Sequence, residues 1–267
     1  MDAAAVLSFD QVSIQFEDVV ALRSVSFAVG SSESLIVLGA AGSGKTTLLK
    51  IALGLLRPDS GRVHLFGQDV TGIAETEWFD VRSRIGVLFQ EGGLFDSLTI
   101  EENVAYPLRY QRLLEVPEEQ IAPRVQQSLD FVELGHTLEK FPSELSGGMR
   151  RRVGIARAIV TQPQLLLYDS PTAGLDPITA NNIVSLIVKG RDLRHTTTVM
   201  VTHRAQDGEI MAGYRFDART QHLVPSQNGA RASTRYLVLR DGEVVFDGTP
   251  GELAASRDPY VVRFARH

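Results

Sequence analysis

Residues 39–47 read GAAGSGKTT and lie between the apolar run SLIVLG at 34–39 and a helical pattern at 45–56. The stretch matches G-x-x-x-x-G-K-[ST] in the strand–loop–helix setting that this pattern requires. Its glycines let backbone N–H groups turn inward onto phosphate oxygens, and the start of the helix adds partial positive charge. We therefore predict a phosphate-binding loop that comprises Gly39, Ala40, Ala41, Gly42, Ser43, Gly44, Lys45, Thr46 and Thr47.

The side chains of this loop predict a nucleotide that carries a magnesium ion. Lys45 is placed to reach the β- and γ-phosphates, and the hydroxyl of Thr46 to bind Mg²⁺. Asp169 ends the apolar run LLLYD at 165–169, the usual place of a carboxylate that serves this ion. An aspartate at a strand end often caps a helix instead, but downstream of a phosphate loop the metal role is favoured.

Strand and helix patterns alternate along much of the chain, which favours an α/β fold with a mainly parallel sheet. Residues 6–16 and 22–29 look like an antiparallel N-terminal pair, and 236–248 like a hairpin that turns at Asp241-Gly242. The pattern is mostly helical at about 100–159, and we expect proline breaks at Pro107, Pro117, Pro123 and Pro142. The polar segment 219–235 predicts an exposed loop.

Composition narrows the classes of function. The net charge of −5 argues against phosphate-driven binding of nucleic acid, which needs a basic face. The chain has no cysteine, which excludes disulfides and thiolate metal sites. No run approaches the roughly 20 apolar residues that cross a bilayer. The first residues lack a basic region followed by an apolar stretch, so we expect no signal peptide. We expect docking on a membrane only through a partner.

A second stretch, ELSGGMRRRVGIARAI at 144–159, also suits an anion. Ser146 is placed to cap the helix that follows, and Gly147 and Gly148 allow close approach of a ligand or another backbone. The helix start would then form a second phosphate site. In a symmetric dimer, each phosphate loop can meet this helix of the other copy.

With these motifs in this order, the chain resembles the nucleotide-binding subunit of ABC transporters. The phosphate loop, LSGGM at 145–149, the LLLYD strand and the isolated His203 carry the resemblance, which covers about residues 7–264. It implies one ABC ATP-binding domain over 1–267 with a RecA-like P-loop NTPase core. The core and an antiparallel β subdomain occupy 1–90 and 159–267, and a helical subdomain occupies 91–158.

The resemblance also implies roles for single residues around ATP and Mg²⁺. Phe16 would stack on adenine, and His203 would contact the γ-phosphate. Ser146, Gly147 and Gly148 would contact the γ-phosphate of the other copy, and Asp176 lies in the loop that links the two sites. The implied metal ligands are Thr46, Gln90 and Asp169, and the implied catalytic group is Asp169, Ser170, His203 and Gln90.

The stretch VLFQEGGLFDSLTIEENVAYPLR at 87–109 is similar to ATPases of Mla-type lipid transporters, the systems built around MCE-domain proteins. LSGGM, GLDPITA at 174–180 and DPYVVRF at 258–264 agree with this. The resemblance implies four things: a second copy, a transmembrane permease with an MCE-type substrate-binding protein, lipid as cargo, and a peripheral place on the cytoplasmic face of the inner membrane. It implies no nucleic acid. Apolar Leu94, Phe95 and Leu98 either line a groove for the permease or pack inside the helical subdomain.

Ser170 departs from the family, which places a glutamate there to polarise the attacking water. A serine hydroxyl is not a base near pH 7, and positioned general-base catalysis contributes about 10²–10⁴-fold. Three interpretations stay open: a natural serine with a slow or regulated cycle, an introduced substitution that traps the ATP-bound dimer, or another carboxylate such as Glu91. Nucleotide binding should survive in all three.

Residues 208–235 are a second departure, because the family usually passes from the histidine to the last hairpin in a shorter span. We expect a surface insertion there. Three functions compete: a transporter motor, a soluble ABC-type ATPase that acts on nucleic acid or ribosomes, and a regulator that binds ATP but barely hydrolyses it. The single phosphate loop and the acidic charge favour the first, and Ser170 keeps the third open.

Overall fold

The computed structural model describes residues 5–111, 115–226 and 233–265. The chain divides into two compact units. The first unit comprises Met1–Ala74 and Val188–His267, and the second comprises Glu75–Ile187, which includes the helical subdomain expected at 91–158. Among the helices of the described ranges, none combines the length and the apolar character that crossing a membrane requires.

The first unit begins with an antiparallel sheet in the strand order β2-β1-β4-β5. Every buried residue of β1 is apolar, and these side chains alternate with more exposed ones, as expected for a strand with one covered face. Phe9 and Phe27 stack with ring centroids 4.8 Å apart and join β1 to β2. The strands are β1 (Leu7–Phe16), β2 (Val19–Val29), β4 (Ser60–Leu65) and β5 (Gln68–Asp69).

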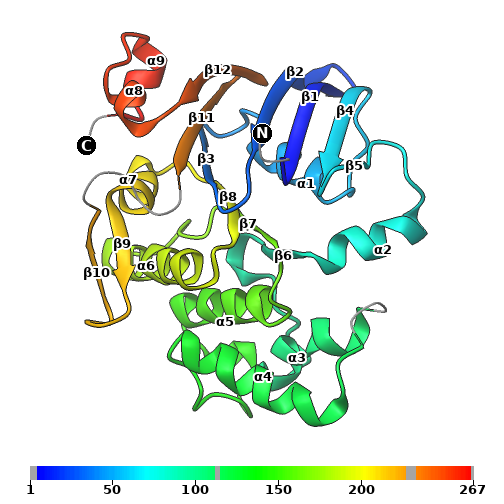
Figure 1. Cartoon of the computed structure of the whole chain (residues 1–267), viewed down its shortest axis with the longest axis vertical. Helices are drawn as coiled ribbons and strands as arrows, with labels where there is room; N and C mark the ends of the chain where they lie inside the picture. The colour runs from blue at the N-terminus through cyan, green and yellow to red at the C-terminus, as the bar shows by residue number, and fades with distance from the viewer. Residues whose placement is uncertain (1–4, 112–114, 227–232, 266–267) are drawn as a thin grey trace. The chain divides into compact units, whose positions relative to one another are not determined.

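The same unit contains four further strands in the order β12-β11-β3-β8 (Figure 1). β3 is buried along its whole length and lies parallel to both neighbours. Asp241 and Gly242 join β11 to β12 with φ of 50° and 81°, the backbone of a tight hairpin turn, so the expected hairpin is confirmed. The strands are β3 (Ser34–Gly39), β8 (Thr197–Val201), β11 (Thr234–Arg240) and β12 (Glu243–Gly248).

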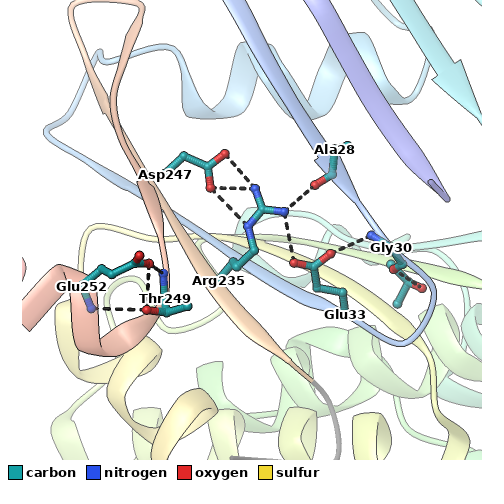
Figure 2. A network of polar contacts seen from close by, with 8 residues as sticks. Ala28, Gly30, Glu33, Arg235, Asp247, Thr249 and Glu252 are labelled. Atoms are coloured by element: carbon teal, nitrogen blue, oxygen red, sulfur yellow. Dashed lines mark hydrogen bonds and ion pairs between the residues drawn. The ribbon is translucent and has the colours of Figure 1, made fainter. Parts of the chain in front are cut away.

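A polar network ties the starts and ends of these strands together (Figure 2). The guanidinium of Arg235 on β11 donates three hydrogen bonds of 2.6, 2.7 and 3.2 Å to the Asp247 carboxylate on β12. It also donates to the Ala28 carbonyl at 3.0 Å and to Glu33 at 3.3 Å. Glu33 in turn accepts from the Gly30 N–H at 2.7 Å. One side chain thereby holds β2, the turn before β3, β11 and β12 in register.

The helices of the first unit are short, and the boundary between the units falls within α6 (Pro177–Arg194). Arg191 of α6 is 1% exposed and donates to the carbonyls of Met211 and Tyr214, and to the carboxylate of Asp192. These bonds anchor the segment that follows β8. The other helices are α1 (Lys45–Ala52), α7 (Ala205–Gly213), α8 (Pro250–Ala254) and α9 (Pro259–Val262).

The segment 208–235 holds more structure than the sequence predicts. Residues up to Gly213 complete α7, and a hairpin of β9 (Tyr214–Asp217) and β10 (His222–Pro225) follows. The expectation of a loop over 219–235 is therefore wrong at β10, whose Leu223 and Val224 pair with β9, and at 234–235, which begin β11. Residues 227–232 of the expected insertion lie outside the described part of the chain.

The second unit places helices beside a short parallel pair, β6 and β7. Helices α3, α4 and α5 contact one another, and their buried residues are mostly apolar. Thr99 and Glu102 form a capping box that starts α3. The elements are α2 (Glu75–Ser83), β6 (Ile85–Leu88), α3 (Ile100–Tyr110), α4 (Glu118–Phe131), α5 (Gly147–Ile159), β7 (Leu165–Asp169) and the 3₁₀ turns η1 (Gln90–Gly92) and η2 (Pro142–Glu144).

Two of the expected proline breaks are wrong. Pro107 lies inside α3 and Pro123 inside α4, whereas Pro117 and Pro142 lie at element starts. A proline inside a helix costs about 3 kcal/mol. Each of these helices buries three apolar side chains one turn apart on the same face, and that burial offsets the cost. The buried side chains are Ile100, Val104 and Leu108 in α3, and Ile121, Val125 and Leu129 in α4.

Candidate functional site

The predicted phosphate loop connects β3 to α1 in the first unit. Gly44 caps α1 with φ of 99°, and a Cβ at this position would overlap the Ala21 carbonyl on β2. A Cβ at Gly39 would lie 2.5 Å from the Leu239 carbonyl oxygen on β11. These approaches require glycine, so the loop lies tightly against its neighbouring strands. The start of α1 then directs partial positive charge to the same place.

Lys45 lies over the loop that contains it. Its ammonium group donates to the carbonyls of Gly39 at 2.9 Å and Ala40 at 2.7 Å, and to the Ser43 hydroxyl at 3.3 Å. The residue is only 9% exposed, so its charge is held in a fixed position by loop atoms. Thr46, the next residue, is exposed at the first turn of α1. The loop is thus a preformed cradle with a cation at its centre.

His203 lies two residues after the end of β8, the strand that pairs with β3. The Thr202 N–H donates to the Val37 carbonyl at 3.0 Å, which places His203 beside the carboxyl end of the strand that carries the loop. Its side chain is exposed. The turn is held by Asp207, which is fully buried, accepts from the Thr202 hydroxyl at 2.7 Å and pairs with Arg204. His203 therefore lies beside the end of β3 from which the phosphate loop leads, and its contact with phosphate stays a prediction.

Phe16 ends β1 of the same unit and is 42% exposed. A side chain with this exposure does not belong to the hydrophobic core. An exposed ring at a strand end is available to stack on a planar base.

Asp169 and Ser170 lie at the end of β7 in the second unit. Asp169 is 6% exposed, and its carboxylate accepts a hydrogen bond of 3.2 Å from the Ser170 hydroxyl. Ser170 has a φ of 48°, in the left-handed region that few residues other than glycine adopt. The hydroxyl is thus turned toward its neighbour's carboxylate. The side chain of Glu91, the substitute base considered from sequence, lies outside the described part of the structure.

Ser146 caps α5 as the sequence predicts, because its hydroxyl accepts from the Met149 N–H at 3.2 Å. Gly147 and Gly148 form the first turn of this helix. A Cβ at Gly148 would lie 2.6 Å from the Thr179 side chain of α6, which would have to shift to make room for it. The helix start is consequently free of side-chain bulk, as an anion site requires.

Arg151 is a residue of this site that the sequence analysis missed. It is 5% exposed and donates from α5 to the carbonyls of Pro171 at 3.2 Å and Ala173 at 2.6 Å. The loop after Ser170 is thereby bonded to the helix that Ser146 caps. The run MRRRV showed three basic residues, but the pattern does not tell which of them is buried.

Asp176 caps α6, since its carboxylate accepts from the N–H groups of Ile178 at 3.1 Å and Thr179 at 3.0 Å. The hydrogen bonds from the Thr179 side chain and backbone hold the pKa of Asp176 below its usual value. The residue is exposed, so the loop that it ends is open to a partner.

Gln90 is exposed at the start of η1, directly after β6 and Phe89. Arg157 holds the next turn by donating to the carbonyls of Gly92 at 3.1 Å and Gly93 at 2.7 Å. Of the three apolar candidates for the permease groove, Phe95 is 43% exposed, whereas Leu94 and Leu98 are half-buried. The exposure of Phe95 therefore favours the groove interpretation for that residue, and the partial burial of Leu94 and Leu98 favours packing inside the helical subdomain.

Comparison with known proteins agrees with this arrangement. The family described as ABC transporter matches residues 22–173, which is more than half of the chain. The chain therefore belongs to the ABC transporter family, as an ATP-binding subunit that couples ATP hydrolysis to transport.

Relatives with different cargoes show similar identity. The chain is 39% identical over 251 residues to the Arabidopsis thaliana chloroplastic protein TRIGALACTOSYLDIACYLGLYCEROL 3, with 91% of this chain and 68% of that one covered. It is 34% identical to the intermembrane phospholipid transport system ATP-binding protein MlaF of Haemophilus influenzae, with 93% and 86% covered. It is 40% identical to the sulfate/thiosulfate import ATP-binding protein CysA of Synechococcus elongatus, with 98% and 68% covered.

Solved structures match the fold. The ATP-binding cassette MJ0796, a dimer bound to ADP and phosphate, superposes with a TM-score of 0.74 at 28% identity, covering 91% of this chain and 98% of that one. The cbiO1 protein of Clostridium perfringens, part of the transporter complex cbiONQ, gives 0.78 at 26% identity, covering 97% and 93%. The predicted α/β P-loop NTPase fold of the ABC ATPase type is confirmed.

Proposed function

We propose that this chain is the motor of a lipid transporter and acts as a pair of copies on a membrane permease. The length of the match to the phospholipid relative carries the choice of cargo. Identity alone does not separate the candidates, because the sulfate relative is slightly more similar. The match, however, spans 86% of MlaF and only 68% of CysA, so less of the MlaF sequence lies outside the match.

Nucleotide binding by the first unit follows from the phosphate loop. The Lys45 ammonium would exchange its loop carbonyls for β- and γ-phosphate oxygens, a stronger charge-assisted contact. Phe16 would stack on the adenine, and His203 would contact the γ-phosphate. Each of these side chains is available in the first unit: Lys45 at the centre of the cradle, Phe16 and His203 exposed.

The second unit would bind the nucleotide of the other copy. Ser146, Gly147 and Gly148 begin a helix of 13 residues whose first N–H groups and partial positive charge suit the γ-phosphate. Asp176 lies exposed in the loop that would link the two sites. The dimeric cassette solved with ADP and phosphate supports a two-copy arrangement.

Magnesium fits the oxygen donors that these segments provide. We assign Thr46, Gln90 and Asp169 to the ion: a hydroxyl, an amide oxygen and a buried carboxylate. Mg²⁺ prefers such hard oxygen ligands and retains several waters, so a small set from the protein suffices. When bound, the ion would neutralise negative charge that develops on the phosphate groups.

Hydrolysis would be slow, because Ser170 orients water but does not accept its proton. The hydroxyl already donates to Asp169, so it has the geometry of a positioning group. Phosphoryl transfer depends mainly on positioning and charge stabilisation, which allows turnover without a strong base. Arg151 would keep the loop after Ser170 fixed to α5 in this step.

The permease would dock on the segment after Gln90. Phe95, Tyr106 and Tyr110 form a chain of rings with centroids 4.7 and 4.6 Å apart, and all three are at least 37% exposed. Exposed clustered aromatics are typical of protein interfaces. Docking on a permease would put the chain at the cytoplasmic face of the inner membrane, and an MCE-type protein would be the further partner.

Reconstitution tests the cargo. The chain is co-expressed with its genomic neighbours, purified from membranes and placed in vesicles, and ATPase rates are measured with phospholipid, sulfate or methionine supplied. We expect co-purification with a permease and stimulation by phospholipid. Stimulation by sulfate or methionine alone would assign another cargo, and recovery of a free chain would refute the motor assignment.

A nucleotide-dependent regulator is the second candidate, and Ser170 favours it. ATP affinity and turnover, measured on one preparation, separate the two. Micromolar binding with turnover that phospholipid does not raise indicates a regulator. Turnover that rises in the complex indicates a motor.

A further inference from the structure

The C-terminal part of the first unit reaches the phosphate loop through one hydroxyl group. Tyr260 lies in α9, far along the chain from the loop. Its hydroxyl accepts a hydrogen bond of 3.0 Å from the Ala40 N–H and donates one of 3.0 Å to the Leu239 carbonyl. The group therefore bridges the loop and strand β11.

This bridge continues a strand ladder that ends at the loop. β3 and β11 pair in parallel from Ser34 with Thr234 to Gly39 with Leu239, and Ala40 is the first residue beyond the last pair. The Ala40 N–H donates to the Tyr260 hydroxyl rather than directly to a strand carbonyl. The Tyr260 hydroxyl accepts this hydrogen bond and in turn donates one to the Leu239 carbonyl. The loop thus leaves the sheet in a defined direction.

The bonded peptide is the one that also holds the Lys45 ammonium. In the peptide between Gly39 and Ala40, the carbonyl accepts from Lys45 at 2.9 Å while the N–H donates to Tyr260 at 3.0 Å. The two groups of a trans peptide point in opposite directions. Tyr260 therefore sets the rotation of the peptide whose other side carries the lysine of the loop.

Several contacts fix Tyr260 in this place. Asp258 caps α9 by accepting from the N–H groups of Tyr260 at 2.7 Å and Val261 at 3.2 Å. The ring meets Phe264 edge to face at 5.4 Å, and the guanidinium groups of Arg240 and Arg263 lie 5.5 and 5.8 Å from its centroid. The hydroxyl is consequently held in position before any nucleotide binds.

We infer that Tyr260 is a positioning residue for the phosphate loop, through which the C-terminal segment 249–265 sets the affinity for ATP. This inference rests on the proposed assignment of the loop to the nucleotide. A hydrogen bond between neutral groups is worth about 0.5–1.5 kcal/mol, and 1.4 kcal/mol is tenfold in an equilibrium constant. Loss of the hydroxyl should weaken ATP binding about three- to tenfold.

The test compares four full-length proteins: wild type, Tyr260→Phe, Tyr214→Phe and Lys45→Ala. Tyr260→Phe removes only the hydroxyl. Tyr214→Phe makes the same change on β9, where the ring is 40% exposed. ATP affinity, KM and kcat, melting temperature, and amide hydrogen exchange at Ala40 are measured on each.

We expect Tyr260→Phe to raise the Kd and KM for ATP about three- to tenfold and to speed exchange at Ala40. Its kcat at saturating ATP and its melting temperature should stay close to those of wild type, and Tyr214→Phe should change nothing. Unchanged affinity, or a loss of affinity that only follows a lower melting temperature, would overturn the inference. Lys45→Ala separates the two ways in which unchanged affinity in Tyr260→Phe can arise. If Lys45→Ala also binds ATP like wild type, the assignment of the loop to the nucleotide is wrong. If Lys45→Ala loses ATP binding, the loop assignment stands and only the role of Tyr260 is wrong.

Discussion

At the scale of single residues, the serine at position 170 has the largest consequence for the proposed catalysis. The backbone of Ser170 is left-handed, and its hydroxyl donates to the Asp169 carboxylate. The resemblance predicts that a base is missing at this position, but not that the serine bonds to the predicted metal ligand. The hydroxyl therefore occupies part of this carboxylate and supplies no general base.

Ser170→Glu should raise the ATPase rate at least tenfold, because general-base catalysis contributes about 10²–10⁴-fold. The rate is measured at saturating ATP and magnesium, with Ser170→Ala as the control that removes the hydroxyl without adding a base. An unchanged rate in Ser170→Glu would show that the base lies elsewhere or that a step other than chemistry limits turnover.

The elements of the second unit are held mainly by caps and by buried side chains. Ser146 starts α5 and Asp176 starts α6, both as acceptors for backbone N–H groups. Sequence predicts such starts well because the capping residue lies next to the helix it caps. Arg151, in contrast, bonds to carbonyls some 20 residues later in the chain, and no local pattern indicates it.

The cap at Asp176 should give a pH-dependent stability. Hydrogen bonds from Thr179 lower its pKa in the folded state below the usual 3.8. A lowered pKa means that the stabilisation is complete above 3.8 and is lost as the pH falls through the lower folded value. The difference in melting temperature between wild type and Asp176→Ala, without nucleotide, should be constant from pH 7 to 5 and shrink below pH 4.

Asp176→Asn is the control, because its amide oxygen still accepts a hydrogen bond but does not titrate. The difference between wild type and Asp176→Asn should therefore depend on pH in the same acid range only. A difference for Asp176→Ala that persists unchanged at pH 3 would show that the carboxylate charge has no part in the cap.

The hairpin of β9 and β10 should be dispensable for nucleotide binding. β10 pairs only with β9 among the described strands, and the anchoring bonds of Arg191 go to Met211 and Tyr214, which precede the turn. Deleting residues 221–233 should leave ATP affinity within about twofold of wild type. Loss of binding in a protein that still folds, as judged by circular dichroism, would make the hairpin part of the site.

At the scale of the whole molecule, the proposed site is complete only in a pair of copies. The phosphate loop lies in the first unit and the helix capped by Ser146 in the second. In the proposed function each would supply one side of a phosphate site, and the similar cassette MJ0796 is a dimer bound to ADP and phosphate. With Ser170 in place of a glutamate, the ATP-bound pair should persist long enough to isolate.

Ser146→Arg should abolish this pair. In wild type with ATP and magnesium, size-exclusion chromatography with light scattering should show a dimer that is absent without nucleotide. A long cation at the cap removes its acceptor and blocks the helix start. Ser143→Arg, the same change at an exposed serine of η2, should still pair. A dimer in Ser146→Arg would place the second phosphate contact elsewhere.

The sequence by itself determined the phosphate loop, the cap at Ser146 and the Asp241-Gly242 hairpin, because each depends on neighbouring residues and on backbone angles that few residue types adopt. Only the tertiary structure decided which arginine of the run MRRRV is buried and which residue bonds to the Ala40 N–H. It also explains why the helices α3 and α4 continue through Pro107 and Pro123. These features depend on burial and on hydrogen bonds between segments far apart in the chain, which local patterns do not encode.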